Sequence, residues 1–329
     1  MSYIKFENYI NEKIIHGNEK LTIVIGSGFH KQAFCQNKEE FNILTNWCCL
    51  LKEVSPKITL TDNYLLDFER YIIEETNCQK DKSVSKIENK NLILLTDKLK
   101  KSQNIAIESL SEKYPIYILN PKYVSDVISL NFDTVAEELF KLNYKQFKKC
   151  SNSTKNEFFI NPKTNDKVLS NSKYFNQYSN GSDIIKFWYP HGNIKRPTSL
   201  ILSIRKYSAH LKAVEALREK MKKDEREHKY DIPSEKQTWF SQLVHTNVLI
   251  LGASISYNEW DIWSALVARK RNYAKAQHLI NEKYIFQLKI TEKNESVNIN
   301  TKQLWFNPIC SKNSEANEQW EMISKLLSK

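Results

Sequence analysis

Four short segments of the chain place glycine or polar residues directly after an apolar run. They contain Gly26-Ser27-Gly28, Asn131-Phe132-Asp133, His191-Gly192 and Gly252-Ala253-Ser254. Glycine lets the backbone approach a phosphate closely, an amide can orient a water or a hydroxyl, and histidine can accept a proton near neutral pH. Together these residue types predict a nucleotide-binding site with acid-base chemistry.

The Gly26-Ser27-Gly28 turn follows the apolar run at 21–25 and precedes a predicted helix. A strand that breaks sharply into a helix exposes backbone N–H groups beside the positive end of the helix dipole, where a pyrophosphate can bind. The third glycine of the usual dinucleotide fingerprint is absent, because Lys31 stands at that position. By itself the motif fits either a phosphate site or an ordinary strand-to-helix turn.

His191 and Asn131 are the candidate catalytic residues. His191 follows an apolar run and precedes a glycine, where it could accept a proton from a ribose hydroxyl, although a structural or surface histidine fits the same pattern. The uncharged amide of Asn131 could orient a water or a ribose hydroxyl. Asp133 could contact the ligand or cap a helix that begins near Thr134.

Composition indicates a folded enzyme. The 329 residues are 41% hydrophobic and 12% aromatic, which favours one large α/β domain over the whole chain, 1–329. The net charge of +11 is consistent with a nucleic-acid contact, an acidic partner or a lysine-rich composition, and abundant Lys, Asn and Ile favour the last. Three basic clusters keep an indirect role with nucleic acid open, or form solvated surface: Lys195-Arg196, Arg205-Lys206 and Arg269-Lys270-Arg271.

The six cysteines show no regular spacing, and we recognise no secretory signal, so we expect free thiols and a cytoplasmic protein. Cys48 and Cys49 are adjacent and cannot form the paired half of a zinc site. No apolar run reaches the roughly 18 residues that suggest a membrane span. We therefore expect no membrane partner.

The apolar pattern predicts alternating strands and helices, and hence a parallel sheet. Buried strands are expected at 21–25, 127–130, 187–189, 200–202, 248–251 and 284–288. Helical periodicity is present at 9–14, 41–51, 65–72, 92–99, 135–140, 211–221 and 262–267. A surface loop is expected at 81–91, and a surface insertion that could cover the ligand at 148–182.

The ordered set of four motifs resembles the NAD-binding signature of sirtuins, and more closely the divergent bacterial sirtuin-like domains of antiphage defence systems. Two further features fit that branch: Arg205-Lys206-Tyr207 after the His-Gly pair, and Ser254-Ile255-Ser256 leading into Glu259-Trp260-Asp261-Ile262. The resemblance spans about residues 21–288. It implies a Rossmann-like parallel sheet with helices on both faces, with helical and loop insertions.

The resemblance implies that NAD is the substrate and assigns residues to it. Gly26, Ser27, Gly28 and Phe29 would bind NAD around its phosphates, and Asn131 and Asp133 would lie by the nicotinamide ribose. His191 would be the catalytic base. Gly252 and Ser254 would complete the phosphate and adenosine side.

Two departures from the deacylases of that family redirect the expected chemistry. No cysteine occurs between Cys150 and Cys310, so the paired cysteines of a zinc ribbon are missing and no metal is expected. Phe29-His30-Lys31 stands in place of an Asp-Phe-Arg segment. We therefore expect hydrolysis of NAD to nicotinamide and ADP-ribose, acting in antiphage defence. The alternatives are an NAD-dependent protein deacylase and a non-catalytic subunit that binds NAD or ADP-ribose.

Unrestrained loss of NAD would harm the cell, so an enzyme of this kind is expected to need control. We expect a companion defence protein or a homo-oligomer. Trp305, Phe306 and Trp320 could dock such a partner, or could pack on the core of the domain itself.

Overall fold

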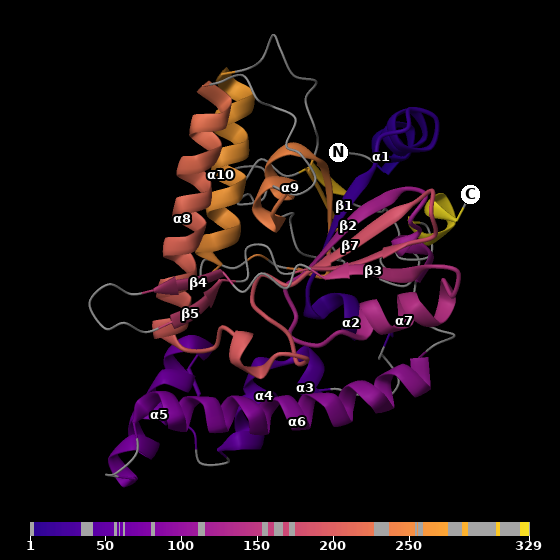
Figure 1. Cartoon of the computed structure of the whole chain (residues 1–329). Helices are drawn as coiled ribbons and strands as arrows, with labels where there is room; N and C mark the ends of the chain where they lie inside the picture. Colours follow the sequence, from indigo (N-terminus) through magenta and orange to yellow (C-terminus); the bar gives the residue numbers. More distant parts are fainter. Residues whose placement is uncertain are drawn as a thin grey trace, which may run out of the picture.

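An eight-stranded sheet lies at the centre of the computed structural model (Figure 1). Its order is β10-β9-β8-β1-β2-β7-β6-β3. In chain order the strands are β1 (Leu21–Ile25), β2 (Val124–Ser129), β3 (Lys148–Asn152), β6 (Phe175–Ser179), β7 (Ile184–Trp188), β8 (Asn247–Leu251), β9 (Ile285–Leu288) and β10 (Asn307–Ile309). Neighbours from β10 to β7 are parallel, whereas β6 and β3 add antiparallel pairs at one edge.

The structure describes residues 3–33, 42–55, 58, 60–61, 63–79, 83–110, 116–152, 157–160, 167–170, 175–226, 237–253, 255, 259–275, 285–288, 307–309 and 323–328. Among these residues, no helix has the length and apolar character needed to cross a membrane.

Strand β1 lies at the point where the strand order reverses. The chain runs from β1 to β2 and β7 on one side, and later to β8, β9 and β10 on the other. This is the arrangement of a doubly wound sheet, in which ligands bind beyond the carboxyl ends of the strands at the reversal point. A ligand site is therefore expected at the turns that follow β1, β2, β7 and β8.

Helices cover both faces of the sheet, as predicted (Figure 1). Along β1, Ile23 and Ile25 enter the core on one face, whereas Val24 between them enters the core on the other. This alternation follows from the two-residue period of a strand and explains why a run buried on both faces is continuously apolar. The first core includes side chains of α4, α5, α6 and α7, and the second includes those of α8, α9 and α10.

The labelled helices fall into three groups along the chain, and a further short helix is described at 323–327. Before β2 come α1 (Tyr3–Tyr9), the π-helix η1 (Ile10–Ile15), α2 (Ser27–Ala33), α3 (Asn42–Thr45), α4 (Trp47–Val54), α5 (Tyr64–Cys78), α6 (Val84–Leu110) and the 3₁₀ turn η2 (Ile116–Leu119). Helix α7 (Val135–Asn143) follows β2. After β7 come the 3₁₀ turn η3 (Pro197–Ser199), α8 (Ile204–Arg226), α9 (Trp239–His245) and α10 (Trp260–Lys275).

The surface loop predicted at 81–91 is wrong from Val84 onward, because α6 begins there. Its first turns bury Ile87, Glu88 and Asn91, and Asn91 accepts a hydrogen bond from Tyr71 of α5 at 3.1 Å. Some of the lysines and asparagines that suggested a loop lie instead on the solvent-facing side of a packed helix. Tertiary packing therefore outweighs the low helix propensity of this segment.

Two other predicted elements differ from the structure. The single helix expected at 41–51 is two helices, because Asn46 ends α3 and caps α4 by accepting the Cys48 N–H at 2.9 Å. The strand expected at 200–202 is a buried connection. There, the Ile201 N–H donates to the His191 carbonyl at 3.0 Å, so this apolar run supports the His191 turn.

The segment at 148–182 contributes strands as well as loops. Strands β3 and β6 extend the main sheet, while β4 (Glu157–Ile160) and β5 (Lys167–Ser170) pair with each other as a separate two-stranded sheet. Strand β5 lies near α8 and η3. That the insertion covers a ligand stays a prediction.

Candidate functional site

The four predicted turns lie at one edge of the sheet. Strands β1, β2, β7 and β8 are parallel neighbours, so their carboxyl ends face the same way. Backbone hydrogen bonds join the turns directly: Gly26 N–H donates to the Leu251 carbonyl at 3.0 Å, and Leu130 N–H donates to the Ile25 carbonyl at 2.9 Å. Segments far apart in the sequence therefore meet beyond the strand ends.

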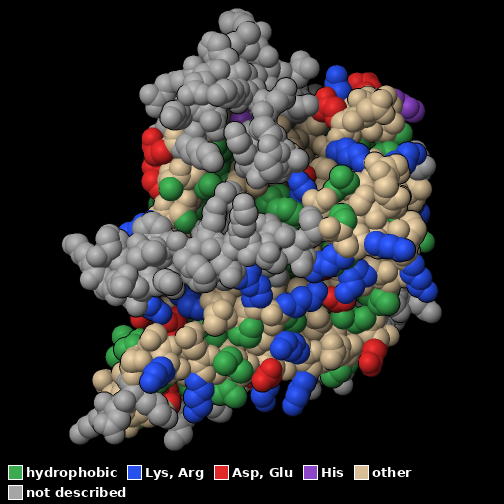
Figure 2. Space-filling model, in the orientation of Figure 1, with side chains coloured by type: hydrophobic (Ala, Val, Ile, Leu, Met, Phe, Trp, Pro, Cys, Tyr) green, Lys and Arg blue, Asp and Glu red, His purple; other side chains and the backbone are tan. Residues whose placement is uncertain are grey.

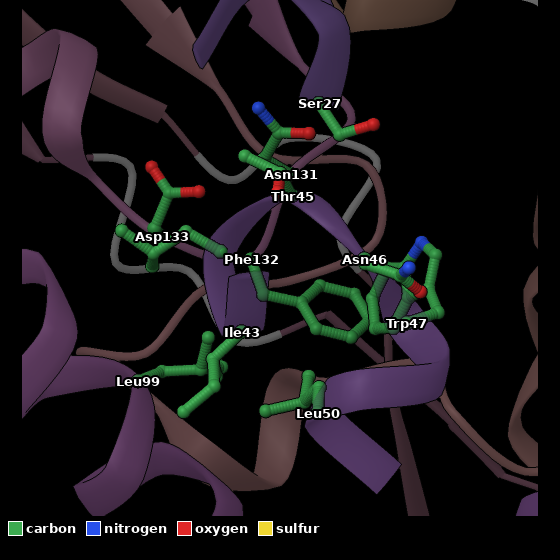
Figure 3. Close-up of a pocket in the computed structure, with 11 residues that line it drawn as sticks. Ser27, Ile43, Thr45, Asn46, Trp47, Leu50, Leu99, Asn131, Phe132 and Asp133 are labelled. Carbon is green, nitrogen blue, oxygen red and sulfur yellow. The ribbon is translucent and has the colours of Figure 1, made fainter. Parts of the chain in front are cut away.

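Three predicted site residues, Ser27, Asn131 and Asp133, line one pocket at this edge. The cavity is small, with a volume of about 20 Å³, which is enough for a water molecule or a single hydroxyl group. Figure 3 shows these polar residues toward one side and apolar residues toward the other. The remaining lining residues come from α3, α4, α6, the turn between α3 and α4, and the turn after β2: Ile43, Leu44, Thr45, Asn46, Trp47, Leu50, Leu99 and Phe132.

The side chain of Asn131 has an unsatisfied polar atom. Asn131 is only 6% exposed, and its buried Nδ2 atom has no hydrogen-bond partner among the residues that the structure describes. Leaving a buried donor unpaired costs about 1–3 kcal/mol, so such groups are rare unless a ligand or water completes them. Asn131 is therefore the residue of this pocket best suited to bind an acceptor oxygen.

Asp133 has two structural partners. Its Oδ1 accepts the Val135 N–H at 3.0 Å at the start of α7, which is the capping role considered from the sequence. The same carboxylate faces His30 of α2, whose Nε2 lies 2.9 Å from Oδ1 and 3.1 Å from Oδ2. Both side chains are buried. Sequence reasoning noted His30 only as a departure from the deacylase pattern and missed this pair.

The glycine turns after β1 and β8 pack against each other. A Cβ atom on Gly26 or Gly28 would lie 2.7 or 2.8 Å from the Gly252 carbonyl oxygen. Gly252 has φ +61°, and a Cβ there would lie 2.0 Å from the Phe29 nitrogen. Close approach of two backbone segments therefore explains all three glycines.

The backbone amides of these turns are partly occupied. Gly26 N–H donates to Leu251, Gly28 N–H donates to Gly252 at 2.8 Å, and the side chain of Phe29 lies in the core. Contact of Gly26, Ser27, Gly28, Phe29 and Gly252 with a nucleotide stays a prediction. Ser254 lies outside the described residues.

His191 lies in the turn after β7 but does not line the Asn131 pocket. His191 is 6% exposed, and its Nε2 lies 2.9 Å from Oδ2 of Asp261, in the first turn of α10. Burial works to lower the pKa of His191, but the Asp261 carboxylate and a hydrogen bond to the Leu130 backbone raise it above its ordinary value overall. Leu130 directly precedes Asn131, so the two predicted catalytic residues flank one strand end.

Asp261 also binds two side chains of α8. His210 Nε2 lies 3.1 Å from Oδ2, and the Tyr207 hydroxyl donates to Oδ1 at 3.2 Å. The oxygen and the two imidazole nitrogens lie within 4.8 Å of one another, a spacing that a metal ion could bridge. Each of these atoms already has a hydrogen-bond partner within the cluster. Asp261 belongs to a segment that carried the family resemblance, whereas nothing in the sequence singled out His210.

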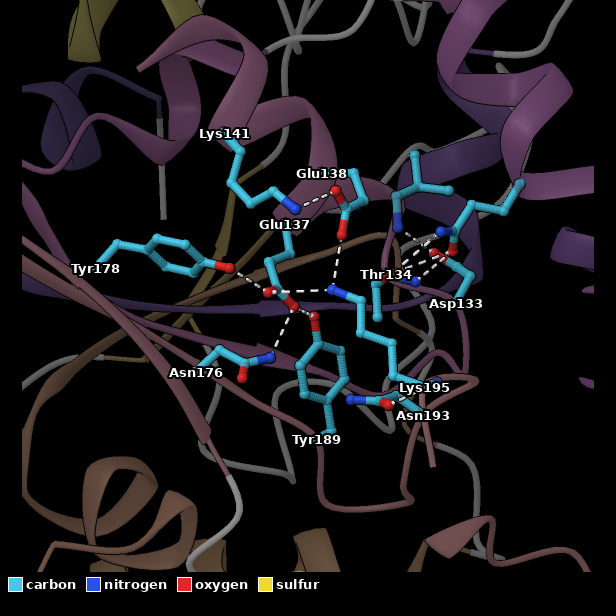
Figure 4. A network of polar contacts seen from close by, with 12 residues as sticks. Asp133, Thr134, Glu137, Glu138, Lys141, Asn176, Tyr178, Tyr189, Asn193 and Lys195 are labelled. Carbon is cyan, nitrogen blue, oxygen red and sulfur yellow. Dashed lines mark hydrogen bonds and ion pairs between the residues drawn. The ribbon is translucent and has the colours of Figure 1, made fainter. Parts of the chain in front are cut away.

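A buried carboxylate anchors the turn that carries His191 (Figure 4). Glu137 of α7 accepts hydrogen bonds from Tyr189, two residues before His191, and from Lys195, four residues after it. Asn176 and Tyr178 of β6 bind the same carboxylate. Glu137 is fully buried, and four donors satisfy its carboxylate. The resulting hydrogen-bond network fixes the turn against α7 and β6.

The basic clusters noted in the sequence are largely used inside the protein. Lys195 binds Glu137 and Glu138, Arg205 binds Glu88, and Arg269 donates to three backbone carbonyls at the end of α9. On the face drawn in Figure 2, Lys and Arg side chains are spread over the surface with other residue types between them. These contacts favour structural roles for the clusters.

The strand order and the polar groups at its reversal point define a Rossmann-type α/β protein. A SIR2-like domain matches residues 125–304, more than half of the chain, so the protein belongs to the SIR2-like family. The match covers the Asn131, His191 and Gly252 segments and begins after the Gly26 turn. Membership supports a sirtuin-like function that involves NAD. No curated protein matches the chain.

Proposed function

We propose that this protein is an NAD hydrolase that cleaves the bond between nicotinamide and ribose. The observation that carries the proposal is the unpaired, buried amide of Asn131 in a pocket at the reversal point of a SIR2-like sheet. A bound ribose hydroxyl or water would supply the missing acceptor. Ser27 and Asp133 line the same pocket from neighbouring strand ends.

Departure of nicotinamide passes through an oxocarbenium-like transition state, which depends on positioning and charge stabilisation. Asn131 would orient the attacking water, which becomes the new hydroxyl of ADP-ribose. His191 would accept a hydrogen bond or proton from a ribose hydroxyl, so that electron density supports the developing cation. Because Nε2 faces Asp261, the hydroxyl would meet Nδ1, where it would replace the hydrogen bond to the Leu130 carbonyl.

Hydrolysis is favoured over protein deacylation by the sequence, because the paired cysteines of a zinc ribbon are missing between Cys150 and Cys310. By resemblance, we further propose that NAD loss serves bacterial antiphage defence by abortive infection. Activity would then be controlled by a companion protein or by self-assembly. Cells that express the wild-type chain should lose NAD during infection and limit phage spread, whereas cells with a His191→Ala variant should do neither.

The direct test incubates the purified full chain with NAD, with and without proteins of neighbouring genes, and measures nicotinamide and ADP-ribose. His191→Ala and Asn131→Ala should each reduce the rate on the order of 100-fold or more. His16→Ala is the matched control, since His16 is exposed in the turn after η1. It should retain the wild-type rate.

Three results would contradict the proposal. Wild-type protein that binds NAD but releases no nicotinamide under any of these conditions would indicate a binding subunit. Acetyl-ADP-ribose formed from NAD and an acetylated peptide would indicate a deacylase. A His191→Ala variant with the wild-type rate would remove the assigned base.

A further inference from the structure

Three buried side chains from separate elements meet behind the His191 turn. His191 follows β7, His210 lies in α8, and Asp261 lies in the first turn of α10. Both imidazoles place Nε2 against the same carboxylate oxygen, at 2.9 and 3.1 Å. None of the three is more than 6% exposed. Water therefore cannot easily replace these contacts, and the cluster sets the orientation of His191.

The charge state of the cluster follows from its contacts. Burial works to raise the pKa of Asp261, but His191 and His210 outweigh it and lower that pKa far below its ordinary value. The carboxylate is therefore ionised, and its place in the first turn of α10 also favours a negative charge. Other ionisable groups near the cluster are Tyr207, Tyr64 and Glu259.

We propose that Asp261 is the positioning residue for His191, and that His210 holds Asp261 in place. This proposal rests on the proposed NAD hydrolase activity. An ionised carboxylate at Nε2 keeps a proton on that nitrogen, so Nδ1 is the nitrogen that would take a proton from a substrate hydroxyl once the hydroxyl replaces the Leu130 carbonyl there. The same carboxylate stabilises the imidazolium that forms when His191 takes up a proton.

His210 is suited to hold Asp261 because it is itself constrained. His210 is 4% exposed, and its ring stacks on Trp239 of α9, with centroids 6.0 Å apart and planes 21° from parallel. Tyr207, one turn earlier on α8, holds the second oxygen of Asp261. The carboxylate is thereby fixed at both oxygens, and His191 is held against it.

The test compares Asp261→Asn with wild type in the full chain. Asparagine keeps the shape of the side chain but removes the charge that selects the tautomer of His191. We expect kcat to fall on the order of 100-fold or more, with a much smaller change in KM. His210→Gln retains an N–H donor toward Asp261 and should reduce kcat much less. Asp261→Glu, which restores the charge, should recover part of the rate.

The pH dependence separates this role from a merely structural one. The acid limb of kcat/KM reports the pKa of His191 as a base in the free enzyme, and the Asp261 carboxylate raises that pKa. The limb should therefore move to lower pH in any residual activity of Asp261→Asn. Histidine NMR titration, with the signal assigned by His191→Ala, should show the same fall in the pKa of His191 without any need for turnover.

The outcomes distinguish the two proposals. If wild type releases no nicotinamide but Asp261→Asn lowers the pKa of His191, the coupling stands and the hydrolase function fails. An unchanged His191 titration in folded Asp261→Asn would overturn the positioning role. A faster reaction in that variant would also overturn this role, because it would show that Asp261 slows the reaction. One equivalent of zinc in the purified protein, lost in both Asp261→Asn and His210→Ala, would make the cluster a metal site and also overturn it.

Discussion

His30 and Asp133 form a buried pair in which one imidazole nitrogen faces both oxygens of the carboxylate, at 2.9 and 3.1 Å. The pair joins α2, which follows β1, to the start of α7, which follows β2. Since Asp133 also caps α7 and lines the pocket of Asn131, this contact couples the first strand-to-helix turn to the candidate site.

The His30–Asp133 pair should show an energetic coupling. Asp133→Asn retains an acceptor for the Val135 N–H and loses the charge, whereas Asp133→Ala loses both and should cost about 2 kcal/mol of unfolding free energy. A double-mutant cycle of Asp133→Asn with His30→Gln, measured by denaturant unfolding, should give a coupling of roughly 1 kcal/mol or more. Strictly additive effects would show that the pair contributes nothing to stability.

Gly252 should tolerate no side chain. Alanine there combines a left-handed backbone with a Cβ atom 2.0 Å from the Phe29 nitrogen, so we expect a loss of at least about 3 kcal/mol. Gly181 is the matched control, because it also has a positive φ, +100°, but no atom of the described residues lies within 4 Å of an added Cβ. Gly181→Ala should cost only about 1–2 kcal/mol. Equal urea midpoints for the two variants would refute the packing argument.

Glu137 should matter far more to stability than its neighbour Glu138. Alanine at 137 leaves the buried hydroxyls of Tyr178 and Tyr189 without their acceptor, which should cost about 3–5 kcal/mol. Glu138 binds Lys141 and Lys195 near the surface, and its loss should cost about 1 kcal/mol or less. Thermal unfolding of both variants checks this, and a comparable loss at the two positions would contradict the assigned network.

Stability should fall as the pH drops from about 6.5 toward 4. Burial, with a smaller effect of Arg269, lowers the pKa of His245 to about 4, so in this window the unfolded chain binds a proton that the folded chain does not. The loss should be on the order of 2 kcal/mol. The raised pKa of His191 affects stability in the opposite direction and in a different pH range. Its contribution is complete below about pH 6.5 and is lost as the pH rises through the pKa of His191 in the folded protein.

The check on this pH effect is denaturant unfolding at several pH values. His245→Gln should flatten the decline between pH 6.5 and 4, while His16→Gln, at an exposed position, should leave it as in wild type. A decline of the same slope in His245→Gln would show that another group is responsible.

Much of the central sheet could be predicted because its strands are buried on both faces. Strands β1, β2, β7 and β8 each contain a short apolar run, and the residues after each run carried the chemistry that suggested a site. The start of α6 could not be predicted, because its first turns read as a polar loop until Ile87 and Asn91 are seen to pack on α5. The run at 200–202 has the composition of a strand, yet it supports the His191 turn.

The sequence by itself determined that Gly26, Asn131, His191 and Gly252 follow parallel strands, and therefore that they lie at one edge of the sheet. Local patterns suffice for this, because apolar runs identify the strands, and strands that alternate with helices form a parallel sheet. Only the tertiary structure decided which groups these residues contact. His30 meets Asp133 across 103 residues, and His191 meets Asp261 across 70, because folding brings helices from separate parts of the chain to the same strand ends.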